Sequence, residues 1–191
     1  MRGKRRDLLL CGGLLAALTL AGCTTTGGSS GEPDARRQAI DAAVDNALSR
    51  LHREAAGSQE LVDAARGVLV FPSVVSAGFM VGGSHGQGAL RKGGKTAGYY
   101  RMTEASVGLL AGAQSQAVYI LFMTEEALRR FEASRGWTAG VDGSISLVTV
   151  GADARVTTQT VRQEIVGFVL TNAGLMGSVS LNGNRITRID L

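Results

Sequence analysis

Ser84 and His85 lie in the run Gly82-Gly83-Ser84-His85-Gly86, which matches the G-x-S-x-G pattern of a serine nucleophile. That pattern requires a sharp strand-to-helix turn and a downstream histidine that accepts the serine proton. Here a further strand-like stretch follows, and the other histidine, His52, lies upstream in a predicted helix. We therefore interpret Ser84 and His85 as strand or loop residues, with a hydrolase built on His52 and Ser84 as the alternative.

A second candidate, Gly94-Lys95-Thr96, matches the last residues of a phosphate-binding loop. Such a loop also needs a glycine five positions before Gly94, where this chain has Ala89, and a helix directly after it. Two histidines and two cysteines are too few for a typical transition-metal site, and the carboxylates of the glycine-rich part are widely spaced. The sequence therefore predicts no catalytic residues, no metal site and no cofactor.

The residue whose chemistry is best defined by its surroundings is Cys23. Arg2, Lys4, Arg5 and Arg6 precede an apolar run over 8–22, which is the pattern of a secretory signal and is short for a membrane span. The run ends in Leu20-Ala21-Gly22-Cys23, which resembles the lipobox of bacterial lipoproteins. The resemblance implies cleavage before Cys23 and acylation of that cysteine, while an ordinary signal or a short core helix is the alternative.

Three segments follow from this interpretation. Residues 1–22 are predicted to be a lipoprotein signal peptide, residues 23–33 the lipidated cysteine and a flexible Gly/Ser/Thr-rich tether, and residues 34–191 one folded domain. Because Thr24 rather than Asp follows the cysteine, the chain resembles outer-membrane lipoproteins. We expect it in the bacterial cell envelope, lipid-anchored in the outer membrane and facing the periplasm or the cell surface.

The charge of the chain changes once the signal is removed. The full chain has 20 Lys+Arg and 16 Asp+Glu, a net charge of +4. The signal holds four basic residues and one acidic residue, so 16 and 15 remain, a net of +1. This near-neutral balance argues against nucleic acid as a partner. The candidate contacts to phosphate headgroups are local instead: Arg91, Lys92 and Lys95 in one glycine-rich turn, with Arg185 and Arg188 as a second group.

The elements that position these residues are predicted from periodicity and caps. An apolar stripe at spacings of three and four predicts a helix over 34–56 that packs on a sheet, or alternatively rests on a membrane. Ser58 is expected to cap a helix over 59–66, and Thr124 one over 125–134 that Gly136 ends. Nineteen of the 27 glycines lie from Gly67 onward, among short strand-like stretches. These stretches cover 68–71, 78–82, 86–91, 98–102, 106–114, 117–123, 144–150, 164–170, 177–181 and 185–189.

The predicted fold class is α+β. The N-terminal helices pack on a glycine-rich, strongly curved antiparallel sheet or small barrel, and one further helix is inserted near 125–134. The dipeptide Asn182-Gly183 predicts a hairpin turn between the last two strands.

Several ordered blocks of sequence stand out: Gly67-Val68-Leu69-Val70-Phe71-Pro72, the run 77–88, the run 106–115, Leu121-Phe122-Met123-Thr124, the run 140–144 and the run 174–183. With these blocks, residues from about Ala39 to Leu191 resemble the SYLF domain, a lipid-binding or actin-binding family. The resemblance implies a non-catalytic module that binds phospholipid; eukaryotic members are associated with phosphoinositides and in some cases actin, and bacterial members are typically secreted or lipoproteins.

The function expected from sequence is therefore a membrane-anchored envelope lipoprotein that binds phospholipid headgroups. The alternative is a structural or protein-interaction lipoprotein of the envelope, without specific lipid binding and with envelope proteins as partners. The oligomeric state stays open.

Overall fold

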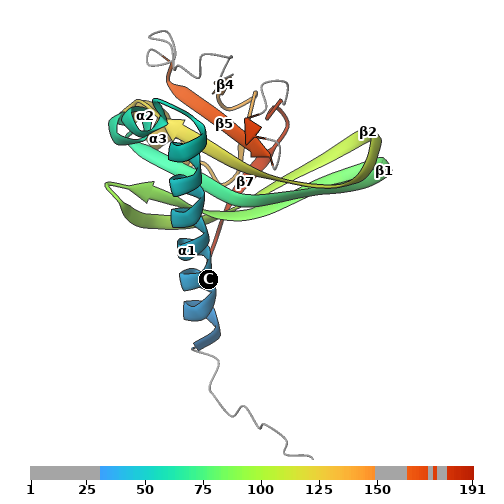
Figure 1. Ribbon diagram of the computed structural model, residues 1–191, viewed down its shortest axis with the longest axis horizontal. Helices are drawn as coiled ribbons and strands as arrows, with labels where there is room; N and C mark the ends of the chain where they lie inside the picture. Colours follow the sequence, from blue (N-terminus) through green and yellow to red (C-terminus); the bar gives the residue numbers. More distant parts are fainter. Residues whose placement is uncertain (1–30, 149–162, 172–173, 176–179) are drawn as a thin grey trace, which may run out of the picture.

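The computed structural model describes residues 31–148, 163–171, 174–175 and 180–191 (Figure 1). The helices are α1 (Gly31–Glu54), α2 (Ser58–Ala64) and α3 (Glu125–Ala133). The strands are β1 (Gly67–Lys92), β2 (Lys95–Phe122), β3 (Trp137–Thr138), β4 (Ser146–Leu147), β5 (Ile165–Thr171), β6 (Gly174–Leu175) and β7 (Arg185–Ile189). They form one curved sheet, which confirms the α+β prediction.

The strand order is β3-β7-β2-β5-β4, with β1 also paired to β2 and β6 to β5. The described pairs are antiparallel except β4 with β5, which run parallel. The wholly antiparallel expectation was therefore wrong at this one edge. A parallel pair needs a long connection, and the segment between Leu147 and Ile165 is long enough to supply it.

The hairpin of β1 and β2 dominates the sheet. Its register runs from Gly67 opposite Phe122 to Lys92 opposite Lys95. The sequence analysis divided this stretch into six short strands, which was wrong. The pairing shifts register between Phe71 and Val74 and between Gly78 and Met80, so these positions are irregularities within one strand rather than strand ends.

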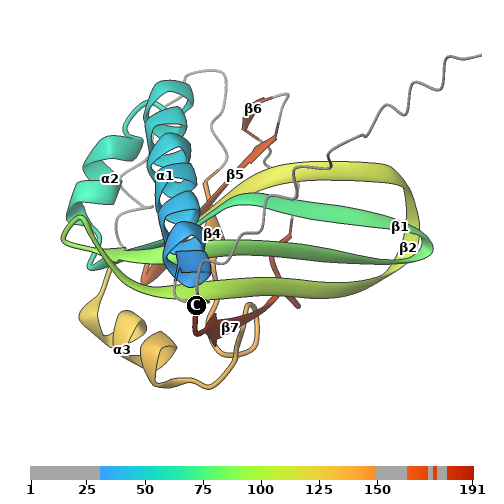
Figure 2. The ribbon, with the colours of Figure 1, turned by 90° about the horizontal axis from the view of Figure 1, so that it is seen from below.

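The hairpin is folded back on itself, so that two of its segments lie face to face (Figure 2). The packing is closest at Gly88, where an added Cβ would lie 1.9 Å from the carbonyl oxygen of Val70. A Cβ on Gly86 would lie 2.9 Å from the carbonyl oxygen of Ser73. Only glycine permits two backbones to approach this closely, so these two positions set the curvature of the sheet.

The two faces of the sheet carry separate hydrophobic clusters. On one face, α1 and α2 cover side chains of β1, β2 and β5 that include Val70, Tyr119 and Phe168. On the other face, α3 covers side chains that include Phe122 and Trp137. The predicted stripe of α1 is buried on the sheet at Ile40, Val44, Ala47, Leu51 and Ala55, which confirms packing rather than membrane contact for this helix.

Helix boundaries differ from the predictions in local ways. α1 begins at Gly31, so Asp34 lies inside the helix, where its carboxylate accepts from Arg37 at 2.8 Å. Gly57, with φ of 80°, stands at the N-cap of α2, and the Ser58 hydroxyl instead donates to the Leu51 carbonyl at 3.2 Å. Thr124 caps α3 as predicted, because its hydroxyl accepts from the Ala127 amide.

The end of α3 and the last predicted strands also differ from the predictions. α3 ends at Ala133, with Ser134 in extended backbone at its C-cap, so Gly136 does not end it. Gly183 adopts φ of 89° and forms a turn with Asn182, but Ser180 and Leu181 before it are not in a strand, so the described residues do not form the predicted hairpin. Most of the predicted strand over 177–181 lies outside the described residues, and β7 pairs with β2 and β3. Among the described residues, no helix has the length and hydropathy required to cross a bilayer.

A first prediction concerns Tyr119, whose buried hydroxyl donates to the Ala47 carbonyl at 2.9 Å and ties β2 to α1. Burial raises the pKa of Tyr119 to about 12. A raised pKa means that this contribution to the free energy of unfolding is complete below pH 10 and is lost as the pH rises toward 12. We expect Tyr119→Phe to cost about 1 kcal/mol at pH 8 and less at pH 11, measured by urea unfolding. A cost that stays constant up to pH 11 would contradict this assignment.

Candidate functional site

The turn between β1 and β2 places two of the predicted basic residues side by side. Gly93 and Gly94 both have positive φ, 55° and 78°, which is the backbone of a tight two-residue hairpin. Lys92 and Lys95 are therefore direct partners across the turn. Both are exposed, so the local backbone presents them to solvent as the sequence predicted.

Arg91 occupies a different environment from the two lysines. Only 13% of its side chain is exposed, and its guanidinium donates to the Asp45 carboxylate at 2.7 Å and to the Asp41 backbone carbonyl at 3.2 Å. It also donates to the Thr96 hydroxyl. The structure thus directs Arg91 inward, where it joins the end of β1 to α1.

Asp41 is the second centre of this network. Its carboxylate accepts from the Thr96 hydroxyl at 2.7 Å and from the Tyr99 hydroxyl at 3.0 Å, and lies 3.6 Å from Arg91. Burial, followed by the hydrogen bond to Asp41, raises the pKa of Tyr99. The tyrosine therefore stays a hydrogen-bond donor at neutral pH, and the network fixes the hairpin end against α1.

The two lysines differ in their partners. The Lys92 ammonium contacts both carboxylate oxygens of Glu132 at 3.1 Å, which links the turn to α3. Within the part of the chain that the structure describes, Lys95 has no ion pair or side-chain hydrogen bond. Of the three basic residues predicted at this turn, Lys95 is the one whose charge is directed only toward solvent.

The second predicted pair lies on β7, on the strand that pairs with 99–103 of β2. Arg185 is exposed, and its guanidinium lies over Gly136, where an added Cβ would be 2.5 Å away. Arg188 is exposed and lines an open hollow of about 310 Å³. The two arginines therefore lie in different surroundings: Arg185 packs on the loop at Gly136, and Arg188 borders the hollow.

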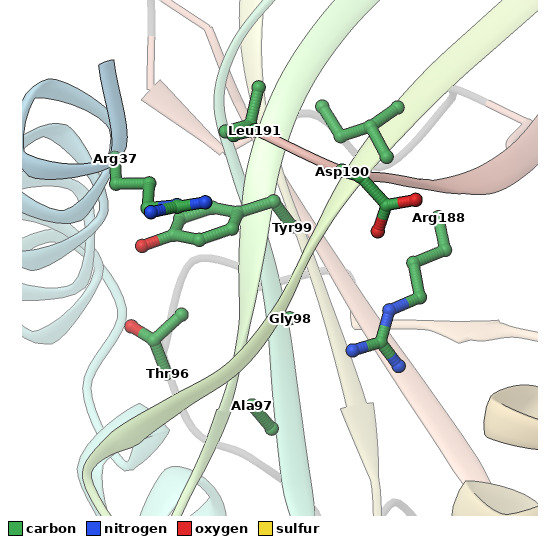
Figure 3. Close-up of a pocket in the computed structure, with 9 residues that line it drawn as sticks. Arg37, Thr96, Ala97, Gly98, Tyr99, Arg188, Asp190 and Leu191 are labelled. Atoms are coloured by element: carbon green, nitrogen blue, oxygen red, sulfur yellow. The ribbon is translucent and has the colours of Figure 1, made fainter. Parts of the chain in front are cut away.

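The hollow contains residues from three elements (Figure 3). Arg37 enters from α1 and lies beside the Tyr99 ring, while Arg188 and Asp190 border the opposite side. The lining residues are Arg37, Thr96, Ala97, Gly98, Tyr99, Arg188, Ile189, Asp190 and Leu191. Sequence analysis did not select Arg37, since it is one of many charged residues on the polar face of α1 and its approach to β7 depends on tertiary packing.

Two guanidinium groups and one carboxylate make the hollow suited to a small polar group. Arg37 is already engaged with Asp34 at 2.8 Å, so its charge is partly compensated. The hollow is lined by Thr96, the chain neighbour of Lys95, and by Arg188, while Arg185 does not line it. The predicted contact of these residues with phosphate stays a prediction.

Ser84 lies within β1 rather than at a strand-to-helix turn. It is buried, and its hydroxyl lies 3.4 Å from the Glu104 carboxylate on β2. His85 is exposed and pairs with Thr103, while His52 belongs to α1. Neither histidine is hydrogen-bonded to Ser84 in the described structure, which agrees with the interpretation of Ser84 as a strand residue. Among the described residues no group of three or more His, Cys, Asp or Glu is placed to hold a metal ion.

Cys23, the predicted lipidation site, lies outside the described residues. The predicted signal peptide and most of the tether lie there too. These assignments therefore rest on the sequence alone.

Part of the chain matches a known family. Residues 103–190 match the family model described as Ysc84, Las17-binding protein actin regulator. The match begins in β2 and continues through α3 to the end of β7, and it supports the SYLF resemblance over this segment, which is under half of the chain. No curated protein matches the chain.

Proposed function

We propose that this chain is a lipid-anchored protein of the bacterial cell envelope whose folded domain binds phospholipid membranes without catalysing a reaction. The family match is consistent with a non-catalytic binding module. The observation that carries the proposal is the motif Leu20-Ala21-Gly22-Cys23 at the end of a basic and then apolar N-terminal segment. An acylated Cys23 commits the domain to a membrane surface.

The anchor lowers the intrinsic affinity for lipid that the domain needs. The seven residues between Cys23 and the start of α1 at Gly31 reach at most about 25 Å, so that headgroups are present at millimolar effective concentration. A weak intrinsic affinity is then sufficient for contact. The exposed Lys95 and its partner across the turn, Lys92, supply positive charge that attracts anionic headgroups.

The anchoring is tested by labelling living bacteria that express the full chain with radioactive palmitate. The protein should incorporate the label and fractionate with the outer membrane, and Cys23→Ser should abolish the labelling because the acyl acceptor is removed. Cys11→Ser, in the segment expected to be discarded, is the matched control and should leave labelling unchanged. Equal labelling of the Cys23→Ser protein would refute the anchor.

Headgroup binding is tested with a version of the protein that begins at Thr24. All residues of both hydrophobic clusters lie from Ile40 onward, so this version retains the described core. It should co-sediment with vesicles that contain phosphatidylglycerol. Lys92→Gln and Lys95→Gln should each lower the affinity about fivefold, because a lysine near an anionic surface contributes about 1 kcal/mol.

Arg101→Gln is the control for those two variants, because Arg101 is an exposed basic residue on the same strand as Lys95 but away from the turn. Its effect should be less than twofold. If all three substitutions weaken binding equally, net charge rather than the hairpin turn governs the attraction.

A protein-binding role is the second candidate, and one observation favours it. The description of the matched family names a protein, Las17, as the binding partner of its members. Crosslinking of the anchored chain to envelope proteins, together with no vesicle binding by the version from Thr24, would favour this function over the first.

A further inference from the structure

The bend of the long hairpin lies away from the helices and from the basic turn. Figures 1 and 2 show β1 and β2 extending together to one side of the molecule, where both strands reverse direction. The Gly93–Gly94 turn lies at the opposite end of the same hairpin (Figure 2). The hairpin therefore has two ends of different character, a basic turn and a bend without charged residues.

The register locates the bend in the sequence. Gly78 pairs with Gly112 and Met80 pairs with Gly108, so that one residue of β1 and three residues of β2 have no partner between these pairs. An unequal gap of this kind bends a strand pair sharply. The unpartnered residues are Phe79, Leu109, Leu110 and Ala111, and all four are apolar.

The segments that lead to the bend carry no formal charge. No Lys, Arg, Asp or Glu occurs over 67–90 or over 105–124. The nearest charged residue on the sheet is Glu104, which neighbours Ser84. A segment that projects from a domain is ordinarily rich in charged and polar residues, so an uncharged bend suits a partner that accepts apolar groups.

The part of the hydrophobic core that the structure describes stops short of the bend. On the outgoing part of β1 the last described core residue is Val74, and the next residue, Val75, is 46% exposed. On the returning part of β2, Gln114 and Ser115 are exposed and the core resumes at Ala117. The five residue-to-residue steps from Val74 to Phe79 span about 16 Å, so the bend projects past the described core of the domain.

From these observations we propose that the bend, residues 77–83 and 105–111, inserts into the interfacial region of a phospholipid bilayer. The inference rests on the proposed membrane function and identifies the contact surface. A bilayer suits this end because its interface accepts apolar residues to a depth of about 5–10 Å and disfavours charge. The continuous pairing of β1 with β2 on both sides of the gap limits the number of backbone groups that insertion would leave unpaired.

The insertion is tested with an environment-sensitive fluorophore on a single cysteine. The version that begins at Thr24 contains no cysteine, because the two cysteines of the chain are Cys11 and Cys23. Phe79→Cys, labelled with nitrobenzoxadiazole, should show a blue shift and at least a twofold rise in emission on addition of phosphatidylcholine/phosphatidylglycerol vesicles. Val141→Cys is the matched control, since Val141 is an apolar residue that is 81% exposed on another loop, and its label should not respond.

A charge placed at the bend should oppose insertion. Leu109→Asp should lower the partition of the unlabelled protein onto the same vesicles at least tenfold, and Val141→Asp less than twofold. Buried Trp137, the single tryptophan, reports in the absence of vesicles whether each variant is folded. Raising NaCl from 50 to 500 mM should weaken headgroup attraction and leave the label on Phe79→Cys responsive.

The failures are distinguishable. One result would overturn insertion and leave headgroup binding by the domain in place. In it the protein binds vesicles, the label on Phe79→Cys does not respond, and Leu109→Asp partitions onto vesicles as well as the unmodified protein does. A label that responds to protein concentration without vesicles would overturn it too, because a second copy of the chain would then cover the bend. Failure to bind any vesicle would overturn both the insertion and the proposed lipid-binding function.

Discussion

Gly88→Ala is expected to destabilise the domain by more than about 3 kcal/mol, which is a large share of the total stability of a native domain. The added methyl group would lie 1.9 Å from the Val70 carbonyl oxygen and 3.0 Å from the Phe71 Cα, so backbone rather than a side chain must move. Overpacking of a core by a single methylene group already costs about 1–3 kcal/mol, and native domains have only about 5–15 kcal/mol in total. The loss should appear as a lower urea midpoint, followed by Trp137 fluorescence and by circular dichroism.

Gly83→Ala on the same strand is the control. Its added Cβ would approach only the Glu104 carbonyl oxygen, at 3.2 Å, and the position is exposed. The substitution should change the free energy of unfolding by less than about 1 kcal/mol, because alanine also lowers the entropy of the unfolded chain. Equal midpoints for Gly88→Ala and Gly83→Ala would mean that the two segments of β1 do not pack at the spacing described here.

The contrast between Gly88 and Gly83 shows which features of the fold can be predicted from the sequence. Helices α1 and α3 were predicted because their signals are local: an apolar stripe every three to four residues, and the Thr124 cap before two glutamates. An abundance of glycine correctly indicated a strongly curved sheet. Which glycine faces which backbone depends on the folding back of β1 at residue 79, and no local pattern specifies that contact.

The division of one long hairpin into six strands has a similar cause. Pro72 and Gly78 are typical strand terminators, and the sequence analysis treated them so. In the structure they mark register shifts, and the pairing with β2 continues beyond each of them. The continuation is determined by the partner strand, which lies more than 30 residues away in the chain at these positions.

Only part of the candidate site could be predicted from the sequence, because the rest depends on contacts between residues far apart in the chain. Lys92 and Lys95 lie at an exposed turn because two adjacent glycines require one, and that is a local inference. The burial of Arg91 depends on Asp41 and Asp45, which belong to α1 and lie about fifty residues earlier. The three basic residues at the turn therefore differ in their surroundings, because Arg91 is largely buried against α1 and the two lysines are exposed. The sequence alone does not distinguish them.

Arg91→Ala is the second substitution with a large expected effect, and it should act on stability. The guanidinium holds the Asp45 carboxylate at 2.7 Å and the Asp41 carbonyl at 3.2 Å, and its loss also leaves Thr96 without a donor. Hydrogen bonds to charged groups contribute about 1.5–3 kcal/mol each, and Asp45 is exposed enough to regain water. We therefore expect a loss of about 2–3 kcal/mol in the free energy of unfolding, measured by urea titration.

Two further variants separate the contribution of shape from that of charge. Arg91→Lys keeps the charge, but its three donors lie on one nitrogen and cannot span Asp45, the Asp41 carbonyl and Thr96 as the wider guanidinium does. It should therefore recover less than half of the lost stability. In the background of Asp45→Asn, Arg91→Ala should cost less than it does alone, because one of its partners has already lost its charge. Full additivity of the two substitutions would show that Arg91 and Asp45 do not interact in solution.

Lys95→Ala is the matched variant at the same turn, with the opposite expectation. Lys95 has no side-chain partner in the described part of the chain, so its removal should leave the urea midpoint within about 0.5 kcal/mol of the unmodified protein. Its vesicle affinity should fall about fivefold, whereas folded Arg91→Ala should retain most of its affinity. A protein in which Arg91→Ala keeps its stability and loses vesicle binding would instead make Arg91 a headgroup ligand, as the sequence first indicated, and would require the α1 contact to open at the membrane.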